Sequence, residues 1–255
     1  MSIDLIRREA SYFFAALRFF TRLPVPAWVG HSQDQLDHAA RYFSIVGLVV
    51  GTLGALATWL AAWALPLSLA ILLGMAATLL VTGAFHEDGF ADSCDGFGGG
   101  WDKAQVLTIM KDSRLGSYGA IGIMLLLLAK WNALMELEEW LLVGLLAAHA
   151  SSRAAAATLI YALDYVRDED SKAKPLARRM SFAELALVWS FGFLPCLLLP
   201  WQNALCAVLL QVLVVWAWAR YSVRRIGGYT GDVLGATQQL GELAFYCGLL
   251  CVFTW

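Results

Sequence analysis

Residues 42–65 read YFSIVGLVVGTLGALATWLAAWAL and contain no charged side chain. A helix of about 20 apolar residues is long enough to cross the roughly 30 Å hydrocarbon core of a bilayer. A second apolar stretch, LSLAILLGMAATLLVTGAF at residues 67–85, begins directly after Pro66. The two stretches predict a pair of membrane-spanning helices connected near Pro66.

The rest of the chain continues this pattern. Its 255 residues are 60% hydrophobic and 15% charged, with a mean hydropathy of +0.64, which is outside the range of ordinary soluble domains. Further apolar windows lie at residues 118–135, 140–163, 182–199, 202–221 and 238–255. The sequence therefore predicts an all-α, polytopic membrane bundle of about seven transmembrane helices, forming a single domain over residues 1–255.

The N-terminal stretch IDLIRREASYFFAALRFFTRLPVP, residues 3–26, mixes aromatic residues with arginine and glutamate. This pattern is typical of an amphipathic helix in the membrane interface, and Pro24 and Pro26 are expected to end it. Because no apolar core precedes a small-residue cleavage site, we expect no removable signal peptide and a mature chain that starts near Met1. The five cysteines lack CxxC spacing, so no disulfide framework is expected.

Positive charges are sorted by location along the chain. All lysines and arginines except Lys130 and Arg153 lie before the first span or in the loops after the second, fourth and sixth spans. The positive-inside rule then places the N-terminus and every long loop in the cytoplasm, with the C-terminus outside. The net charge of −2 says little by itself, because the charges are sorted by location. No nucleic-acid surface is indicated, and the lipid bilayer is the expected partner.

The stretch from residue 86 to 117, HEDGFADSCDGFGGGWDKAQVLTIMKDSRLGS, is crowded with carboxylates. Asp88, Asp92 and Asp95 are spaced i, i+4 and i+7, so in a helix they share one face with neighbours about 6 Å apart. Carboxylates this close repel one another without a cation, and hard oxygen ligands favour Mg²⁺. We therefore predict a Mg²⁺-dependent active-site segment at the cytoplasmic surface.

Glycines and cations in the same segment point to a phosphate ligand. Gly89 and Gly96 directly follow aspartates and allow close approach of the backbone to a ligand. The downstream run supplies cations, a carboxylate, a hydroxyl and a further glycine at Lys111, Asp112, Ser113, Arg114 and Gly116. Phosphoryl transfer needs these groups. A solvated acidic loop is the alternative, although it does not require the glycines.

Three other features have two interpretations each. In IGGYTGDVLGATQQLGE, residues 226–242, Thr230 and Gly231 could contact substrate, and Asp232 could ligate metal or cap a helix. Arg153, within a span, should meet a carboxylate or a substrate phosphate, unless it snorkels to the cytoplasmic edge. His86 could be a metal ligand, a general base, an orienting partner of Asp88 or a satisfied interfacial histidine.

Four ordered segments resemble the cobalamin synthase family, the adenosylcobinamide-GDP ribazoletransferases. These are ALRFFTRLPVP at residues 16–26, FHEDGFADSCDG at 85–96, IMKDSRLGSYG at 109–119 and GGYTGDVLGA at 227–236. The resemblance implies a multi-pass enzyme of the bacterial inner membrane with a cytoplasmic active site. With Mg²⁺, it would join adenosylcobinamide-GDP to α-ribazole or α-ribazole 5′-phosphate and release GMP in the last steps of cobalamin biosynthesis.

On this basis we assign hypothetical roles to individual residues. Asp88, Asp92 and Asp95 would hold the metal between two phosphates, with Asp112 or Asp232 as a further ligand. The cations of Lys111 and Arg114 would stabilise the leaving GMP. A nearby carboxylate or His86 would take the proton of the attacking ribose hydroxyl. The expected substrate contacts are Gly89, Gly96, Ser113, Gly116, Arg153, Thr230 and Gly231.

Two other classes of protein share some of these features. The CDP-alcohol phosphotransferases of phospholipid synthesis also carry aspartates and glycines on a membrane helix, but their motif needs Ala-Arg soon after Asp-Gly and a later aspartate pair that this chain lacks. A secondary transporter would place its charges near the bilayer midplane, whereas here they gather in the predicted cytoplasmic loops. Assembly into a homo-oligomer is an alternative that the sequence leaves open.

Overall fold

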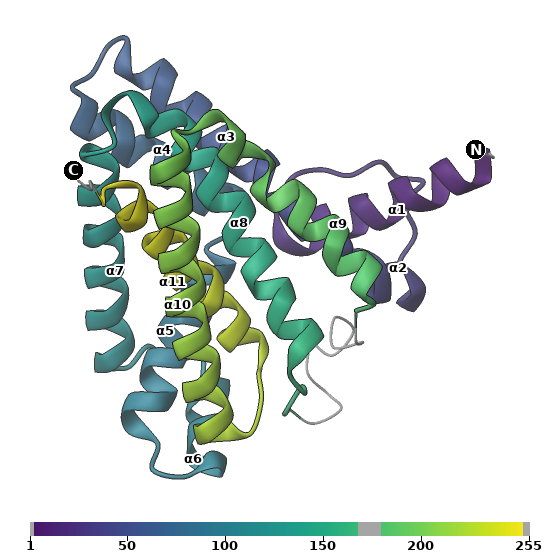
Figure 1. The fold of residues 1–255 in the computed structure, drawn as a ribbon. Coiled ribbons are helices and arrows are strands. Elements are labelled where there is room, and N and C mark those ends of the chain that lie inside the picture. The colour runs from purple at the N-terminus through teal and green to yellow at the C-terminus, as the bar shows by residue number, and fades with distance from the viewer. Residues whose placement is uncertain (1–2, 168–179, 252–255) are drawn as a thin grey trace.

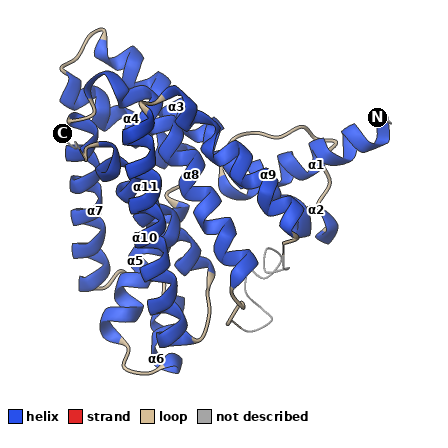
Figure 2. Ribbon diagram, viewed as in Figure 1, coloured by secondary structure: helices blue, strands red, loops and turns tan. Residues whose placement is uncertain are grey.

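The computed structural model describes residues 3–167 and 180–251, and nearly all regular structure in these ranges is helical (Figure 2). The one other regular feature there is an isolated parallel bridge between Tyr165 and Tyr229. In chain order the helices are α1 (Ile3–Phe20), α2 (Gln33–Ala39), α3 (Phe43–Ala62), α4 (Leu67–Thr82), α5 (Phe85–Gly99), α6 (Lys103–Lys111), α7 (Ser117–Met135), α8 (Leu141–Ala162), α9 (Phe182–Phe193), α10 (Trp201–Ile226) and α11 (Gly231–Leu249). Short 3₁₀ turns cover Ala40–Tyr42, Glu138–Trp140 and Leu194–Leu198. The predicted all-α class is confirmed.

The helices that correspond to the predicted spans differ in length and hydropathy. Among the described residues, four helical stretches are long and apolar enough to cross a membrane: α2 and its 3₁₀ turn continuing into α3, α7, α8 with its preceding 3₁₀ turn, and α10. The second predicted span matches α4, which meets this test only together with α5. The fifth matches α9 and its 3₁₀ extension, a shorter apolar helix. The seventh begins inside α11, and its last residues, 252–255, lie outside the described part of the chain.

A sharp bend separates α4 from α5. The two helix axes meet at 88° across Gly83 and Ala84, both with positive φ (66° and 57°). Glycine adopts this left-handed conformation without a steric penalty, so Gly83 ends α4 as a helix C-cap. The bend turns the acidic segment away from the axis of the apolar helix before it.

The centre of the bundle is formed by α11, which packs against α5, α8 and α10 (Figure 1). Neighbours surround this helix on most sides, which explains why it holds buried polar residues and lacks the hydropathy of the lipid-facing helices. On another side of α8, Gly47 and Gly51 let α3 approach its backbone closely. A Cβ at Gly51 would lie 3.0 Å from the Cα of Leu146. Small residues are the usual means of close packing between membrane helices.

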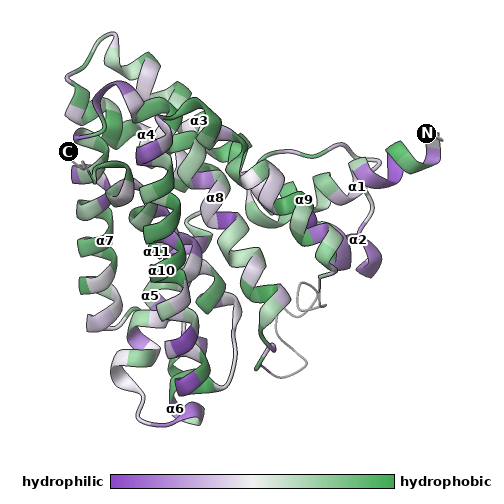
Figure 3. Ribbon diagram, in the orientation of Figure 1, coloured by the Kyte–Doolittle hydropathy of each residue, from purple (hydrophilic) through white to green (hydrophobic). Residues whose placement is uncertain are grey.

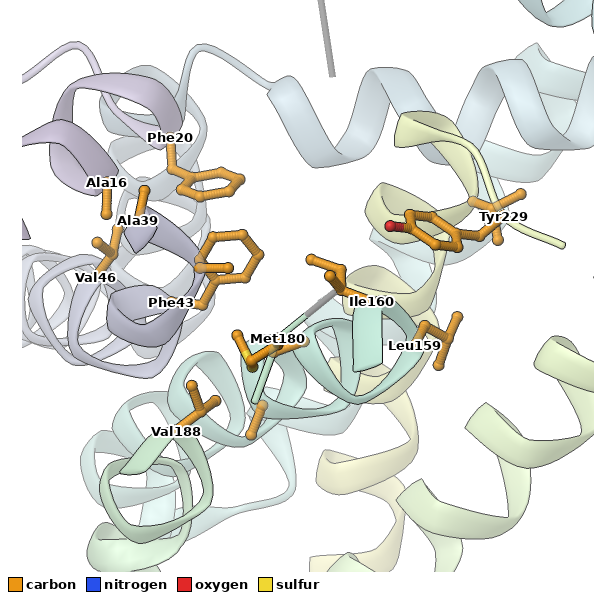
Figure 4. Packing of buried hydrophobic residues seen from close by; sticks show 14 of the residues in the cluster. Ala16, Phe20, Ala39, Phe43, Val46, Leu159, Ile160, Met180, Val188 and Tyr229 are labelled. Atoms are coloured by element: carbon orange, nitrogen blue, oxygen red, sulfur yellow. The ribbon is translucent and has the colours of Figure 1, made fainter. Parts of the chain in front are cut away.

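The predicted N-terminal helix is present as α1 and ends at Phe20, before Pro24 and Pro26. It projects away from the main bundle (Figure 1). Its C-terminal end is fixed by an aromatic cluster in which Phe20 lies 4.4 Å from Phe43, ring centroid to ring centroid. Figure 4 shows this cluster continuing toward Ile160 and Met180. One end of α1 is therefore part of the same core as α3 and α8.

Polar residues gather at one end of the bundle. The α5–α6 region and the C-terminal ends of α8 and α10 lie together at the lower end of Figure 1, opposite the connection between α3 and α4. Figure 3 shows hydrophilic residues concentrated there and along α1 and α2, whereas α3, α7 and α10 are mainly apolar. The lower end is the part of the fold where chemistry on charged substrates is feasible.

Candidate active site

The acidic segment is helical, as the spacing of its aspartates requires for them to share a face. Helix α5 carries Asp88, Asp92 and Asp95, which differ strongly in exposure: Asp88 is exposed, Asp92 is half-buried and Asp95 is 8% exposed. The first two lie one helical turn apart. The third has turned toward α7, so the predicted set of three is divided between two environments.

Asp95 binds the N-terminus of α7. Its two carboxylate oxygens accept hydrogen bonds from the backbone N–H groups of Gly116 (2.7 Å) and Gly119 (2.8 Å). A carboxylate at a helix N-terminus satisfies N–H groups that have no partner in the helix and interacts favourably with the helix dipole. Both glycines are required by this contact, because a Cβ at either position would overlap the Asp95 carboxylate. The predicted substrate contact Gly116 therefore has a structural role.

A close approach between α5 and α11 brings Asp232 to the acidic segment. A Cβ on Gly89 would lie 3.0 Å from the Cα of Asp232, and one on Gly235 would lie 3.0 Å from the carbonyl oxygen of His86. The charge of Asp92 interacts with those of Asp232 and Asp88. We call Asp88, Asp92 and Asp232 the acidic face.

The alternative that Asp232 caps α11 is wrong. Thr230 is the N-cap residue, and its hydroxyl accepts a hydrogen bond from the backbone N–H of Val233 at 3.2 Å. Asp232 lies within the first turn, with its carboxylate free to make other contacts. Thr230 is fully buried and caps α11.

Arg167 is the partner of Asp232, and its part in the site could not be predicted from the motifs. It donates a short hydrogen bond to the Asp232 carboxylate and a second one, of 3.2 Å, to the carbonyl oxygen of Met110 at the end of α6. Burial raises the pKa of Asp232 to about 6, with Arg167 opposing the shift and Asp88 adding to it. The sequence signal of Arg167 is only one basic residue in a basic loop.

The carboxylates of the acidic face fit a Mg²⁺ ion that is also coordinated by a bound substrate. Bound Mg²⁺ usually takes one or two protein carboxylates and completes its octahedron with waters and substrate phosphates. Asp88, which is exposed, and Asp92, which is half-buried one helical turn away, provide that number. In the described ranges no group of three or more histidine, cysteine or acidic side chains is arranged so that it could hold a metal ion by itself. The arrangement therefore matches an open, substrate-completed site better than a structural metal site.

The segment after α6 is exposed beside the acidic face. Asp112 and Arg114 form an ion pair of 2.6 Å with each other, and its hydrogen bonds lower the pKa of Asp112. Lys111 and Ser113 are exposed to solvent. Packing of α6 on α5 holds this segment in place, since a Cβ on Gly96 would overlap the Met110 side chain. Gly96 thus serves helix packing.

His86 and Arg153 meet at a small cavity rather than at the surface. Both line a space of about 30 Å³, together with Gly231. The His86 ring stacks on Phe20, with ring centroids 5.8 Å apart. Arg153 is 3% exposed and donates to the carbonyl oxygen of His149 at 2.9 Å, while its Nε has no hydrogen-bond partner among the described residues. The snorkelling alternative for Arg153 is therefore wrong.

A buried polar network connects this region to the bundle core. Lys130 forms an ion pair of 2.6 Å with Glu242 and donates to the side-chain oxygen of Gln239 at 3.0 Å. The amide of Gln239 in turn donates to Glu87 at 2.7 Å, next to Asp88 in the chain. The network ties α7, α11 and α5 together. Its members come from distant segments, so no local sequence signal predicts the pairing.

Comparisons with known proteins support the resemblance to the cobalamin synthase family. The family model described as cobalamin-5-phosphate synthase matches residues 12–250. The chain is 47% identical over 253 residues to the adenosylcobinamide-GDP ribazoletransferase of Shewanella frigidimarina, covering 96% of each chain. It is 48% identical over 252 residues to the enzyme of that name from Leptothrix cholodnii, covering 95% of this chain and 96% of the relative. The corresponding Ralstonia pickettii protein is 46% identical over 255 residues, at 97% and 98% coverage. No solved structure matches the chain.

Proposed function

The chain belongs to the cobalamin-5-phosphate synthase family and acts as an adenosylcobinamide-GDP ribazoletransferase in cobalamin biosynthesis, and we propose that the transfer takes place at the acidic face. The observation that carries this proposal is the convergence of two separate motifs. Asp88 and Asp92 come from α5, and Asp232 comes from α11, more than 130 residues later in the chain. Their juxtaposition depends on the close contact at Gly89 and Gly235.

The reaction is a phosphoryl transfer. A ribose hydroxyl of α-ribazole, or of its 5′-phosphate, attacks the phosphorus attached to the cobinamide arm of adenosylcobinamide-GDP. The new P–O bond forms as the bridging P–O bond of the pyrophosphate breaks, and GMP leaves with the electron pair. The hydroxyl proton passes to a base in the site. Charge develops on phosphate oxygens, so cations and positioning are the main requirements for catalysis.

We assign the main tasks to residues of the acidic face and its rim. Asp88 and Asp92 would hold Mg²⁺, which would neutralise pyrophosphate charge when bound. Asp232, with a pKa near 6 and an orientation fixed by Arg167, would accept the hydroxyl proton. Lys111 and Arg114 would bind the leaving GMP. The metal roles of Asp95 and Asp112 and the substrate roles of Ser113, Gly231 and Thr230 stay predictions.

We further propose that the site faces the cytoplasm from the inner membrane. The basic residues near the α5–α6 connection and the C-terminal end of α10 lie at the same end of the bundle as the acidic face (Figure 1). The connections at the opposite end, near Pro66 and Pro200, carry no lysine or arginine. The positive-inside rule assigns the basic end to the cytoplasm. Nucleotide substrates and Mg²⁺ are available on that side.

The decisive experiment measures GMP release and corrinoid product formed by the purified, detergent-solubilised protein. The substrates are adenosylcobinamide-GDP with α-ribazole 5′-phosphate or α-ribazole, in Mg²⁺ or in EDTA. We expect turnover only with Mg²⁺, and an Asp92→Asn variant that loses at least about 100-fold in kcat while remaining folded, as expected when a charge-stabilising group is removed.

Asp102→Asn is the matched control. It makes the same change from carboxylate to amide in the same segment, but Asp102 is the exposed N-cap of α6, where asparagine caps equally well. We expect this variant to retain full activity. Equal activity of the Asp92 and Asp102 variants would refute the proposal that transfer takes place at the acidic face. The family assignment would still stand.

A further inference from the structure

A second hollow lies on the side of the bundle formed by α8, α9 and α10. Its volume is about 820 Å³, within the usual range of about 300–1,000 Å³ for ligand pockets. In Figure 1, α9 and α10 diverge from each other on either side of α8. The walls are mainly apolar, with Trp189 and Phe193 from α9 facing Val212 and Trp216 from α10. We call this hollow the α8–α10 groove.

Two arginines lie at one end of the groove. Arg220 and Arg224 are four residues apart on α10, so they share a helix face, and both line the groove and are exposed. Within the described residues neither has a hydrogen-bond or ion-pair partner. The neighbouring Arg225 is different, since it turns toward α5 and donates to the carbonyl oxygens of Phe97 and Gly100. Two guanidinium groups therefore remain available to an anion in the groove.

The position of these arginines along α10 matches the headgroup level of a membrane. The α10 stretch from Trp201 to Ala219 contains no charged residue, and its 19 residues rise about 28 Å, close to the roughly 30 Å hydrocarbon thickness. If α10 enters the hydrocarbon near Trp201, Arg220 lies at the level of the opposite headgroups. Leu205, Leu209 and Leu213 are exposed on α10, as expected for a helix in contact with lipid.

We propose that the α8–α10 groove binds an anionic phospholipid, with an acyl chain along the apolar walls and the phosphate on Arg220 and Arg224. The pairing of an apolar channel with cations at headgroup height specifies an amphiphile with an anionic head. A soluble anion would use the arginines but not the walls. A zwitterionic lipid would use the walls but gain less from the two positive charges. This site is separate from the acidic face and does not depend on the function proposed there.

The test is native mass spectrometry of the full chain in detergent, supplied with equal amounts of phosphatidylglycerol and phosphatidylcholine carrying identical acyl chains. We expect one retained phosphatidylglycerol per protein. The double variant Arg220→Gln/Arg224→Gln should lose about 25-fold of the preference for phosphatidylglycerol, because each arginine near a membrane surface contributes roughly a fivefold factor. Glycerophosphoglycerol, the headgroup without chains, should not compete.

Two further variants separate the groove from general surface charge. Arg7→Gln/Arg8→Gln removes the same charge from exposed positions of α1 and should retain the preference. Val212→Trp fills the groove without changing charge and should reduce retention of both lipids. Thermal unfolding confirms that each variant is folded. Equal retention of the two lipids by the unmodified protein, unchanged selectivity in the Arg220/Arg224 variant, or full competition by the free headgroup would overturn the proposal.

Discussion

Replacing Gly235 with alanine tests whether the contact between α5 and α11 sets the activity. The new Cβ would lie 3.0 Å from the carbonyl oxygen of His86, 3.3 Å from the Cα of Gly89 and 3.4 Å from the Cα of His86. All three neighbours are backbone atoms, which cannot rotate away as a side chain could. The two helices must therefore separate by a few tenths of an ångström, carrying Asp232 away from Asp92.

The expected loss follows from this displacement. A misplacement of about 1 Å can lower a rate by about 100-fold, so a shift of a few tenths should lower kcat about five- to tenfold. Alanine favours a helix by up to about 1 kcal/mol over glycine, whereas overpacking costs about 1–3 kcal/mol. We expect a net loss of roughly 1 kcal/mol in the free energy of unfolding. Helix propensity alone would instead predict that the alanine variant is more stable.

The assay is initial-rate GMP release with saturating substrates and Mg²⁺, paired with thermal unfolding. Gly241→Ala is the control in the same helix, because its Cβ would meet nothing closer than 3.5 Å, at the side chains of Gln211 and Val215. This variant should be fully active and slightly more stable. If Gly235→Ala also retained full activity, or if both variants lost activity equally, the reasoning that the α5–α11 distance positions the acidic face would be refuted.

Three other predictions address individual carboxylates. Asp95→Asn should lower the free energy of unfolding by about 1.5–3 kcal/mol, measured by thermal unfolding, because an amide cannot accept both backbone N–H groups at the start of α7 as a carboxylate does. Glu242→Gln should cost about 3–5 kcal/mol in the same measurement by leaving Lys130 buried without its counter-ion, whereas the exposed Glu139→Gln should change stability by less than about 0.5 kcal/mol. Asp88→Asn should raise the Mg²⁺ concentration needed for half-maximal GMP release about tenfold or more while leaving the unfolding temperature within about 2 °C, and an unchanged Mg²⁺ requirement would contradict its role as a ligand.

The class of fold and most helix positions could be predicted from composition and apolar windows. A stretch such as residues 42–65 has few alternatives to a membrane helix, because its apolar side chains and its backbone N–H and C=O groups are satisfied together only in that form. Hydropathy is less informative for α11. Other helices enclose this helix, so Gln238, Gln239 and Glu242 lie in the core and lower its apparent suitability as a span.

The chemistry of the site could also be predicted in outline. The spacing of Asp88 and Asp92 places them on one helix face whatever the rest of the fold does, because that relation is local. The motif around Asp232 is recognisable as a second polar segment of the same family pattern. What the sequence leaves open is the partner of each carboxylate.

Those partners were decided by tertiary structure. Asp95 binds the N-terminus of α7 because the packing of α5 on α7 brings two N–H groups within reach. Asp232 pairs with Arg167, and Glu242 pairs with Lys130, across more than 60 and 100 residues of chain. A carboxylate accepts hydrogen bonds from whichever donor the fold brings near. The order of residues in the chain does not specify which donor that will be. Local spacing thus determined which residues are acidic neighbours, and helix packing determined which of them remain open to a metal and a substrate.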